Sequence, residues 1–340
     1  MQNIKPKLLI VMDWQPGPAW VFQRELQKHF YTDVLSSRAP KSFQSRFEKI
    51  FGLWKSYAGT ALRALRCAGQ YDVVYAWHAV IGLMLASLCR LLQIKKPAIV
   101  VAQLIVPQKK ESVTQRLKTA FTRYALHRVD CVIVYSSIEV EQFVQEFGNG
   151  RTRFQFTPLG IDALPPLKVE DNGYIFAGGR SNRDYTTLIK AMKALDYPLH
   201  IAAQRFNIPD TQLPVNVHTH FNAFGQDFLD LLAGAALVVI PLDRPVESSG
   251  QLVLLQAMAL GKAIIITQNR GVADYYHGGE SVILVPSHDV ALLEKEIARL
   301  MREPEERQRL GKNAAKKAAE FTLHAQAKNV ADILLAMQQN

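Results

Sequence analysis

The stretch PLDRPVESSGQLVLLQAMALGKAIIIT, residues 241–267, carries the clearest structural pattern in the 340-residue chain. It predicts a strand that ends at Pro241, a polar loop, a helix through Leu260 and a second strand that ends at Thr267. A helix between two apolar strands is the unit of a parallel α/β sheet, and ligands bind beyond the carboxyl ends of such strands. The stretch therefore predicts a doubly wound sheet with a ligand site in its polar loop.

The same alternation of apolar strands and helical segments continues on both sides of this stretch. In the second half, strands are expected near residues 174–178, 198–203, 236–241, 263–267 and 282–285, with helices near 184–195, 226–234, 250–260 and 289–302. In the first half, strands are expected near residues 7–12, 72–76, 97–102 and 130–135, with helices near 19–29, 43–66, 79–93, 111–128 and 137–147. The pattern predicts the α/β class, with two Rossmann-like doubly wound domains that face each other across a cleft.

Domain boundaries are expected from the length of the chain and from two prolines. A chain of 340 residues predicts about two domains, at roughly 150 residues each. Pro165 and Pro166 interrupt regular structure and mark a linker. We expect a first domain over residues 1–162, a second over residues 163–320, and a terminal helix over residues 321–340 that can return to the first domain.

Composition and motifs exclude several classes of protein. Three cysteines without a CxxC pair argue against a disulfide framework and favour a reducing compartment. The longest apolar stretch, Ala79–Cys89, is shorter than the roughly 20 residues that a membrane-spanning helix needs. The chain lacks GxGxxG, GxxxxGK[ST] and HExxH, so dehydrogenase, P-loop and zincin interpretations lose their main support, and no metal site is expected.

The net charge of +10 is unevenly distributed. Residues 1–160 hold 22 Lys and Arg against 10 Asp and Glu, whereas residues 161–340 hold 18 against 20. Such asymmetry fits a first half that meets an anionic surface, and a merely solvated basic surface is the alternative. Because no nucleic-acid recognition motif accompanies the charge, an anionic membrane is favoured over a nucleic acid.

An amphipathic helix is predicted between residues 42 and 66. Aromatic residues recur there at helical spacing among basic ones, namely Phe43, Phe47, Phe51 and Trp54 with Arg46, Lys49, Lys55, Arg63 and Arg66. A second basic run comprises Lys109, Lys110, Arg116, Lys118, Arg123 and Arg128. The pattern favours a helix in a membrane interface, and the alternative is that the aromatic stripe packs on the sheet.

Two stretches of the second half are candidate anion sites. In residues 247–250, Ser248 or Ser249 is expected to cap the following helix. The N–H groups of Gly250, Gln251 and Leu252 would then point into the cleft. An ordinary capped helix is the alternative. In FAGGRSNRDYTTLIKAM, residues 176–192, two glycines permit close backbone approach. They are followed by two arginines whose planar guanidinium groups suit phosphate oxygens.

Both stretches resemble the donor-binding half of family-4-type retaining glycosyltransferases of the GT-B fold. QAMALGKAIIIT is similar to that family's EAMACGKPVIAT, and GGR…RD…LIKA is similar to its GR…KG…LIEA. Residues 158–162 resemble its P-N-G-V-D, and residues 282–286 resemble its LLVPP. In the first half, YDVVYAWHA and HRVDCVIVYSS are similar to its DVVHAH and RADRVIAVS segments. The resemblance covers nearly the whole chain and is most specific in the second half.

The resemblance implies site residues position by position. Arg180 and Arg183 match the basic pair that holds the donor diphosphate, and Gly17 resembles the glycine loop beneath the donor. The remaining donor-binding residues that the two stretches imply are Gly179, Ser249, Gly250, Gln251 and Gln256. Glu247, with Arg180 and Arg183, is the candidate catalytic group and would orient the donor sugar.

Four positions depart from the family pattern or stay open. Gln256 stands where the family has the second glutamate of Glu-x7-Glu, and Glu247 lies one position early for the first. Gln103 stands where the family often has a histidine. His78 follows a predicted strand and is either an acceptor-side residue or a core histidine.

The family implies transfer of a sugar from a nucleotide diphosphate donor with retention of anomeric configuration and without a metal. We expect a UDP-sugar as donor, with a hydroxyl of a lipid, lipid-linked glycan or polysaccharide as acceptor. The expected location is cytoplasmic, peripheral on the inner face of the cell membrane. The departures at Gln256 and Gln103 leave an alternative, a non-catalytic GT-B relative that binds a nucleotide sugar or a protein partner.

Overall fold

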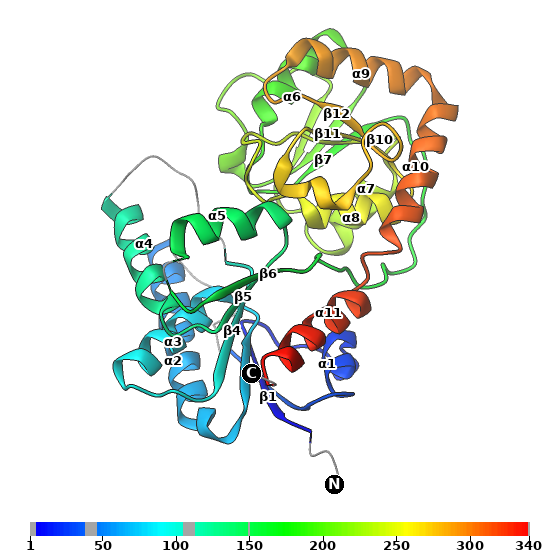
Figure 1. Cartoon of the computed structure of the whole chain (residues 1–340). Coiled ribbons are helices and arrows are strands. Elements are labelled where there is room, and N and C mark those ends of the chain that lie inside the picture. Colours follow the sequence, from blue (N-terminus) through cyan, green and yellow to red (C-terminus); the bar gives the residue numbers. More distant parts are fainter. Residues whose placement is uncertain (1–4, 38–45, 105–112, 149, 339–340) are drawn as a thin grey trace. The chain divides into compact units, whose positions relative to one another are not determined.

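The computed structural model describes residues 5–37, 46–104, 113–148 and 150–338, with backbone alone for residues 46–50 and Thr114. It divides into two compact units (Figure 1). Unit 1 contains Met1–Thr157 and His324–Asn340, and unit 2 contains Pro158–Leu323.

Unit 1 is built on a six-stranded parallel sheet with the order β2-β1-β3-β4-β5-β6. Its strands are β1 (Lys7–Met12), β2 (Tyr31–Ser36), β3 (Val73–Ala76), β4 (Ala98–Ala102), β5 (Cys131–Val134) and β6 (Arg153–Phe156). Its helices are α1 (Val21–Leu26), α2 (Arg46–Cys67), α3 (Ala79–Leu91), α4 (Val113–Leu126), α5 (Ser137–Phe147) and α11 (Leu323–Ala336), with a 3-10 turn at Ala68–Gln70. The inner strands are buried on both faces, as the continuous apolar runs predict.

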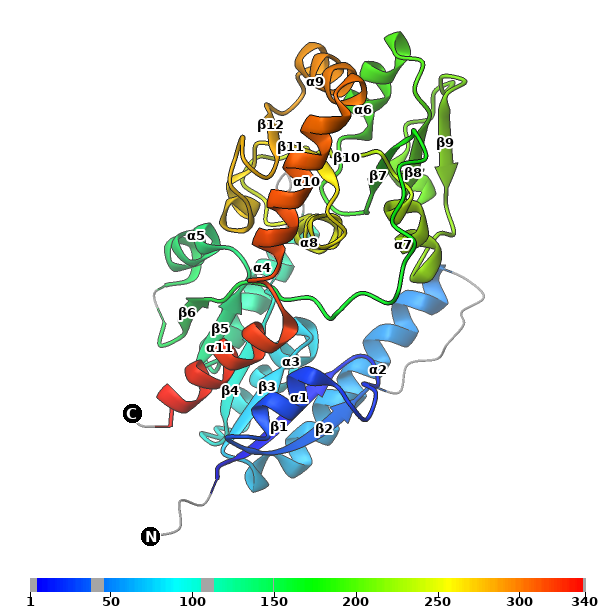
Figure 2. The same cartoon turned by 90° about the vertical axis from the view of Figure 1, so that its right-hand side faces the viewer.

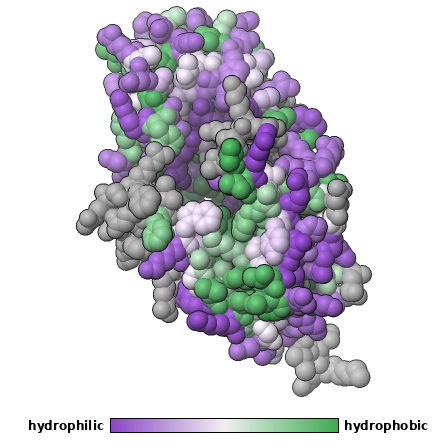
Figure 3. Space-filling view, turned by 90° about the vertical axis from the view of Figure 1, so that its left-hand side faces the viewer, coloured by the Kyte–Doolittle hydropathy of each residue, from purple (hydrophilic) through white to green (hydrophobic). Residues whose placement is uncertain are grey.

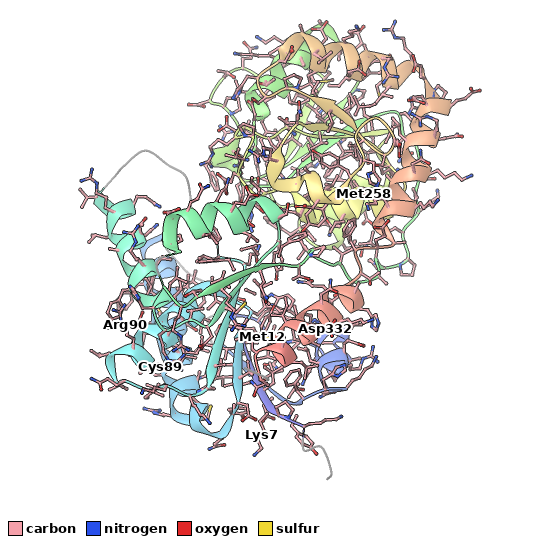
Figure 4. All side chains as sticks on the ribbon, in the orientation of Figure 1. Lys7, Met12, Cys89, Arg90, Met258 and Asp332 are labelled. Atoms are coloured by element: carbon pink, nitrogen blue, oxygen red, sulfur yellow. The ribbon has the colours of Figure 1, made fainter. Side chains whose placement is uncertain are left out.

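Helix α3 packs directly on the sheet of unit 1 because it carries a glycine at the contact. A Cβ atom at Gly82 would lie 2.6 Å from the Ala76 Cβ and 2.8 Å from a Val101 methyl group. Met12, at the end of β1, is fully buried on the other face of the sheet (Figure 4).

Unit 2 is built on a second six-stranded parallel sheet with the order β12-β11-β10-β7-β8-β9. Its strands are β7 (Ile175–Gly178), β8 (Leu199–Ala202), β9 (Val217–His220), β10 (Leu237–Ile240), β11 (Ala263–Thr267) and β12 (Ile283–Val285). Its helices are α6 (Tyr185–Ala191), α7 (Gln226–Ala233), α8 (Gln251–Ala259), α9 (Val290–Arg302) and α10 (Pro304–Ala318), with 3-10 turns at Met192–Ala194, Arg205–Asn207 and Arg270–Tyr275. Helices cover both faces of the sheet (Figure 2), and a separate apolar cluster fills each face. The prediction of the α/β class with two doubly wound sheets is confirmed.

The strands that sequence analysis missed are β2, β6 and β9, and each lies at an edge of its sheet. The burial pattern of β2 alternates with exposed positions, and β9 has a single buried residue, Val217. A continuous apolar run identifies a strand that is buried on both faces, so an edge strand with polar residues escapes that criterion.

The chain crosses between the units earlier than residue 162, where the linker prolines place the predicted boundary. Ile161 forms a parallel bridge with Thr322, and its N–H donates to the Phe321 carbonyl at 3.0 Å. These bonds make residues 158–162 part of unit 2. The final helix, α11, then belongs to unit 1, where it lies beside α1 in Figures 1 and 2 and His324 pairs with Glu25 at 3.1 Å.

In the part of the chain that the structure describes, every helix is too short or too polar to traverse a lipid bilayer.

Candidate active site

The order of strands reverses once in each sheet, and these two switch points are where ligands bind in open α/β sheets. In unit 2 the reversal falls between β7 and β10, and in unit 1 between β1 and β3. The loops after β7 and β10 contain most of the residues that sequence analysis selected. The two switch points are described separately below.

The loop after β7 places a guanidinium group at the unit 2 switch point. Gly179 has a φ of +115°, and a Cβ atom there would lie 2.4 Å from an Arg183 Nη atom, so only glycine fits. The Arg183 backbone forms a bridge with Leu242, which joins the loops after β7 and β10.

The Arg183 side chain is held in one orientation. Its Nε donates to the Gly178 carbonyl at 3.0 Å, and one Nη donates to the Ser181 carbonyl at 2.7 Å. Burial lowers the pKa of Arg183, and the neighbouring Tyr185 hydroxyl partly opposes this shift. The guanidinium remains charged at neutral pH, because arginine is not deprotonated in proteins. A half-buried, fixed cation therefore lies at the carboxyl end of β7.

Helix α8 begins beside this cation. Gly250 is its N-cap residue, with a φ of +94°, and among the described residues no side chain caps the helix. A Cβ atom built at Gly250 would lie 3.6 Å from two Arg183 nitrogens. The helix end with its unpaired N–H groups and the guanidinium thus converge, which is the arrangement that binds phosphate.

The expectation that Ser248 or Ser249 caps α8 is wrong. The Ser249 hydroxyl accepts from Asn182 Nδ2 at 3.1 Å, and the Ser248 hydroxyl accepts from Gln251 Nε2 at 2.5 Å. Both serines stabilise the loop, so the helix begins one residue later, at a left-handed glycine.

Two asparagines that sequence analysis missed hold the loop after β10. Asn182, with a φ of +53°, accepts from the Arg244 N–H at 2.9 Å and donates to the Arg244 carbonyl at 3.0 Å. From the other side, buried Asn269 donates to the Arg244 carbonyl at 2.8 Å and to the Glu247 carbonyl at 3.3 Å. These hydrogen bonds preorganise the loop. No local sequence pattern predicts them, because the bonded residues lie far apart in the chain.

The Glu247 carboxylate is half-buried and forms an ion pair with Arg244. The Gln251 side chain donates to the Gly271 carbonyl at 3.3 Å, in addition to its bond with Ser248, so only its backbone faces outward from the helix end. Gln256 lies half-buried on the second turn of α8. Arg244 is a further cation in this loop that sequence analysis did not select.

Arg180 is exposed at the start of the loop after β7, where its carbonyl accepts from Asn207 Nδ2 at 2.8 Å. Arg183, Gly179, Ser249, Gly250 and Glu247 therefore gather at the unit 2 switch point, with Arg180 at its margin. Gly17 and Gln103 belong to unit 1. Gly17 is exposed, and Gln103 follows β4 with a φ of +54°, a strained backbone conformation of the kind that clusters at functional sites.

The unit 1 switch point is lined by aromatic rings. Trp77 and His78 follow β3, and Trp14 follows β1 together with Asp13. The Trp20 ring lies 5.3 Å from that of Trp14 and 5.2 Å from that of Trp77. Sequence analysis did not connect these residues, although three tryptophans that follow two predicted strands were a usable signal.

His78 is half-buried within this aromatic group. Its Nε2 lies 3.7 Å from an Asp13 carboxylate oxygen, and its ring packs 4.6 Å from that of Tyr57. Burial lowers the pKa of His78, and the Asp13 charge partly opposes this shift. His78 is thus a neutral imidazole at neutral pH, positioned at a strand end rather than in the core.

A group of possible metal ligands lies in the loops that follow β7, β10 and β12 in unit 2. Asp184, Asp243 and His288 bring one ligand atom each within 4.8 Å of the others. The His288 Nδ1 is bonded to Asp184 at 2.8 Å, and the other Asp184 oxygen accepts from the Thr187 N–H at 2.9 Å. These groups satisfy one another and cap α6, so we assign them a structural role.

Lys262, in the Gly-Lys pair that superficially resembles a P-loop, is also structural. Its Nζ donates to the carbonyls of Glu170 at 2.7 Å and Ala235 at 2.8 Å. Burial lowers the pKa of Lys262 to about 8, and Asp171 partly opposes this shift.

Comparison with known proteins identifies a matching family and similar solved structures. Residues 166–317, which lie within unit 2 and amount to fewer than half of the chain, match the sequence profile of the family described as Glycosyl transferases group 1. No curated protein sequence matches the chain significantly.

Solved structures resemble the whole chain. A sucrose-phosphate synthase from Thermosynechococcus elongatus is 17% identical, with a TM-score of 0.72 over 98% of this chain and 99% of that one. HepE from Anabaena, solved in complex with UDP, is 16% identical, with a TM-score of 0.69 over 97% of this chain and 100% of that one. WaaG, a glycosyltransferase involved in lipopolysaccharide biosynthesis, is 14% identical, with a TM-score of 0.65 over 96% of this chain and 99% of that one. At these identities the likeness establishes the GT-B fold.

Proposed function

We propose that this chain, a glycosyltransferase whose residues 166–317 form a group 1 domain, transfers a sugar with retention from a nucleotide diphosphate donor to a hydroxyl of a lipid-linked acceptor. The observation that carries the proposal is the convergence of the Arg183 guanidinium with the uncapped start of α8 at the unit 2 switch point.

The chemistry of the reaction explains why these groups are suited to it. Negative charge accumulates on the departing diphosphate, and preorganised donors stabilise such charge without having to reorient. Arg183 and the N–H groups at Gly250 and Gln251 are fixed by the loop bonds described above. Exposed Arg180 adds a second cation, so we propose that no divalent metal is needed.

Other residues of the same loops are assigned to the sugar and the nucleoside. Glu247, anchored by Arg244, is proposed to orient the donor sugar. Gln256 is proposed to accept a hydrogen bond from the ribose through its amide oxygen. A UDP-sugar is the favoured donor, and the solved complex of the structurally similar HepE with UDP supports this choice.

The acceptor is proposed to bind unit 1, whose switch point offers aromatic faces and the half-buried imidazole of His78. Apolar and aromatic walls with few polar groups are typical of sites for amphipathic ligands. The likeness to WaaG, involved in lipopolysaccharide biosynthesis, supports an acceptor of the lipid-linked class.

Helix α4 supports attachment of unit 1 to an anionic membrane face. Exposed apolar residues follow one stripe of the helix, with Val113 76% and Leu117 65% exposed, and Phe121 and Tyr124 continue it. Basic residues on the same helix are Arg116, Lys118 and Arg123. Figure 3 shows apolar side chains at the surface on the side of unit 1 that carries α4. An apolar stripe flanked by cations is typical of an interfacial helix.

On α2, Phe51 and Trp54 are 64% and 47% exposed, which favours the membrane interpretation of this helix over packing on the sheet. Phe43, Lys109 and Lys110 of the predicted basic and aromatic runs lie outside the described residues. The same applies to the side chains of Arg46, Phe47 and Lys49.

The test is a donor panel. The full-length chain is incubated with UDP-, GDP- and ADP-sugars in the presence of EDTA, with and without a mixture of lipid-linked acceptors, and released nucleotide is measured. We expect release from one UDP-sugar that EDTA does not abolish and that acceptor accelerates. Nucleotide-induced thermal stabilisation without turnover of any donor would instead favour the non-catalytic alternative.

A further inference from the structure

Three histidines lie together on the edge of the unit 2 sheet, in strands that the proposed donor site does not use. His200 is on β8, and His218 and His220 are on the edge strand β9. His200 is paired directly opposite His218, and Ala202 is paired opposite His220. Because alternate residues of a strand face the same side, all three imidazoles project from one face of the sheet.

The His200 and His220 rings are close enough to share a ligand, whereas His218 must turn before all three can, because the described residues that already bring three possible ligand atoms within 4.8 Å of one another are Asp184, Asp243 and His288. His200 Nδ1 and His220 Nε2 form a hydrogen bond with 3.0 Å between the nitrogens, and their ring planes are inclined by only 14° with centroids 5.0 Å apart, so a metal ion would have to displace the hydrogen that they share. The His218 ring centroid lies 5.2 Å from that of His200. Two imidazole nitrogens on one zinc ion, each at ~2.0–2.1 Å in tetrahedral geometry, are about 3.3 Å apart. The His200 and His220 nitrogens are therefore already near the required separation.

The surroundings fix one ring and leave another free to adjust. The Tyr174 ring packs 4.5 Å from that of His200, and its hydroxyl donates to the Leu231 carbonyl at 2.7 Å. His218 is exposed, so its imidazole can turn toward the other two. An open hollow beside His220 is also lined by Asn222 and Asp227, which leaves room for water or a carboxylate as a fourth ligand.

The protonation state of the cluster is compatible with coordination. Burial lowers the pKa of His200, and the neighbouring His220 and His218 imidazoles lower it further. Burial and His218 also lower the pKa of His220. Neutral imidazoles carry the lone pair that a metal ion needs.

We propose that His200, His218 and His220 form a binding site for one divalent transition-metal ion of the Zn²⁺, Ni²⁺ and Cu²⁺ class. Imidazole is a preferred ligand of these ions, whereas Mg²⁺ and Ca²⁺ prefer oxygen. The ion would join β9 to β8 across the exposed edge of the sheet and stabilise the folded unit 2, because it binds only where the three residues are assembled. The site is independent of donor binding, so neither proposal depends on the other.

The test is a Zn²⁺ titration of tag-free, full-length protein by isothermal calorimetry, with thermal unfolding measured in parallel. We expect one Zn²⁺ per chain and a higher melting temperature with Zn²⁺ but not with Mg²⁺. The variant His218→Asn/His220→Asn should weaken Zn²⁺ binding by about 100-fold or more, since even outer-shell changes at metal sites cost roughly 10–100-fold.

The matched control is His29→Asn/His127→Asn, which removes two exposed histidines from unit 1 and should leave binding unchanged. If the double variant at the cluster unfolds without metal, the single change at exposed His218 is used, with a loss of about tenfold expected. Absence of saturable Zn²⁺ binding to the unaltered chain, or an equal loss in the control, would overturn the proposal. If the proposal is correct, Co²⁺ added to the unaltered chain gives the visible absorption bands of a tetrahedral site. The His218→Asn/His220→Asn variant should not show these bands.

Discussion

The two switch points have the same backbone architecture and opposite chemistry. At β7 and β10 of unit 2, the loops present a fixed guanidinium, two left-handed glycines and an uncapped helix end. At β1 and β3 of unit 1, they present Trp14, Trp77 and the half-buried His78. A parallel sheet thus supplies a place for ligands, whereas the loop residues determine which ligand binds. We interpret the first as the place for a pyrophosphate and the second as the place for an amphipathic acceptor.

The largest effect is expected at Arg183, the fixed guanidinium of the unit 2 switch point. Arg183→Met should lower sugar transfer by about 10²–10³-fold and weaken UDP more than uridine, because a preorganised donor to developing charge is lost. Transfer kinetics and calorimetric binding of UDP and uridine measure this. The matched control is Arg205→Met, a change at an exposed arginine of the same unit. An equal loss of UDP and uridine binding would show that Arg183 does not bind the phosphates.

The second-largest effect is expected at the exposed apolar stripe of α4, which we propose contacts the membrane. Leu117→Glu/Phe121→Glu should reduce binding to anionic vesicles by roughly 100-fold, since each of the two apolar side chains contributes about 1.5 kcal/mol in a membrane interface, the low end of the range for full burial. Co-sedimentation with phosphatidylglycerol and phosphatidylcholine vesicles at low and high salt checks the result. Val169→Glu/Val215→Glu in unit 2 adds the same charge at exposed positions and should have little effect. Vesicle binding that depends neither on lipid charge nor on salt concentration would contradict electrostatic attachment.

A smaller and more selective effect is expected at the aromatic rings of unit 1. Trp14 is 41% exposed beside Trp20, so Trp14→Ala should raise the acceptor KM about tenfold while leaving acceptor-independent donor hydrolysis unchanged. Tyr31→Ala on β2 is the matched control, because its ring is 59% exposed and lies at the amino end of the strand, outside both the switch point and the proposed membrane surface. If donor hydrolysis fell together with acceptor affinity, the division of tasks between the two switch points would be wrong.

Sequence analysis located the unit 2 loops correctly because their residues are close together in the chain. Gly179, Arg183 and Gly250 each follow a strand that a continuous apolar run identifies. Asn182, Asn269 and Arg244 were missed because their role consists of bonds between loops. The capping error at Ser248 and Ser249 has the same cause, since the hydroxyl of Ser249 is engaged by Asn182, 67 residues away in the chain.

The sequence by itself determined the inner strands, the helices between them and the basic character of the first half, because periodicity and charge are properties of neighbouring residues. Tertiary structure alone decided which edge strands complete each sheet and where the chain crosses between the units. It also decided that the Ser248 and Ser249 hydroxyls bind side chains rather than the start of α8, and that His200 and His220 are hydrogen-bonded. These contacts join residues that are distant in the chain, and only the pairing of the folded strands and loops brings them together.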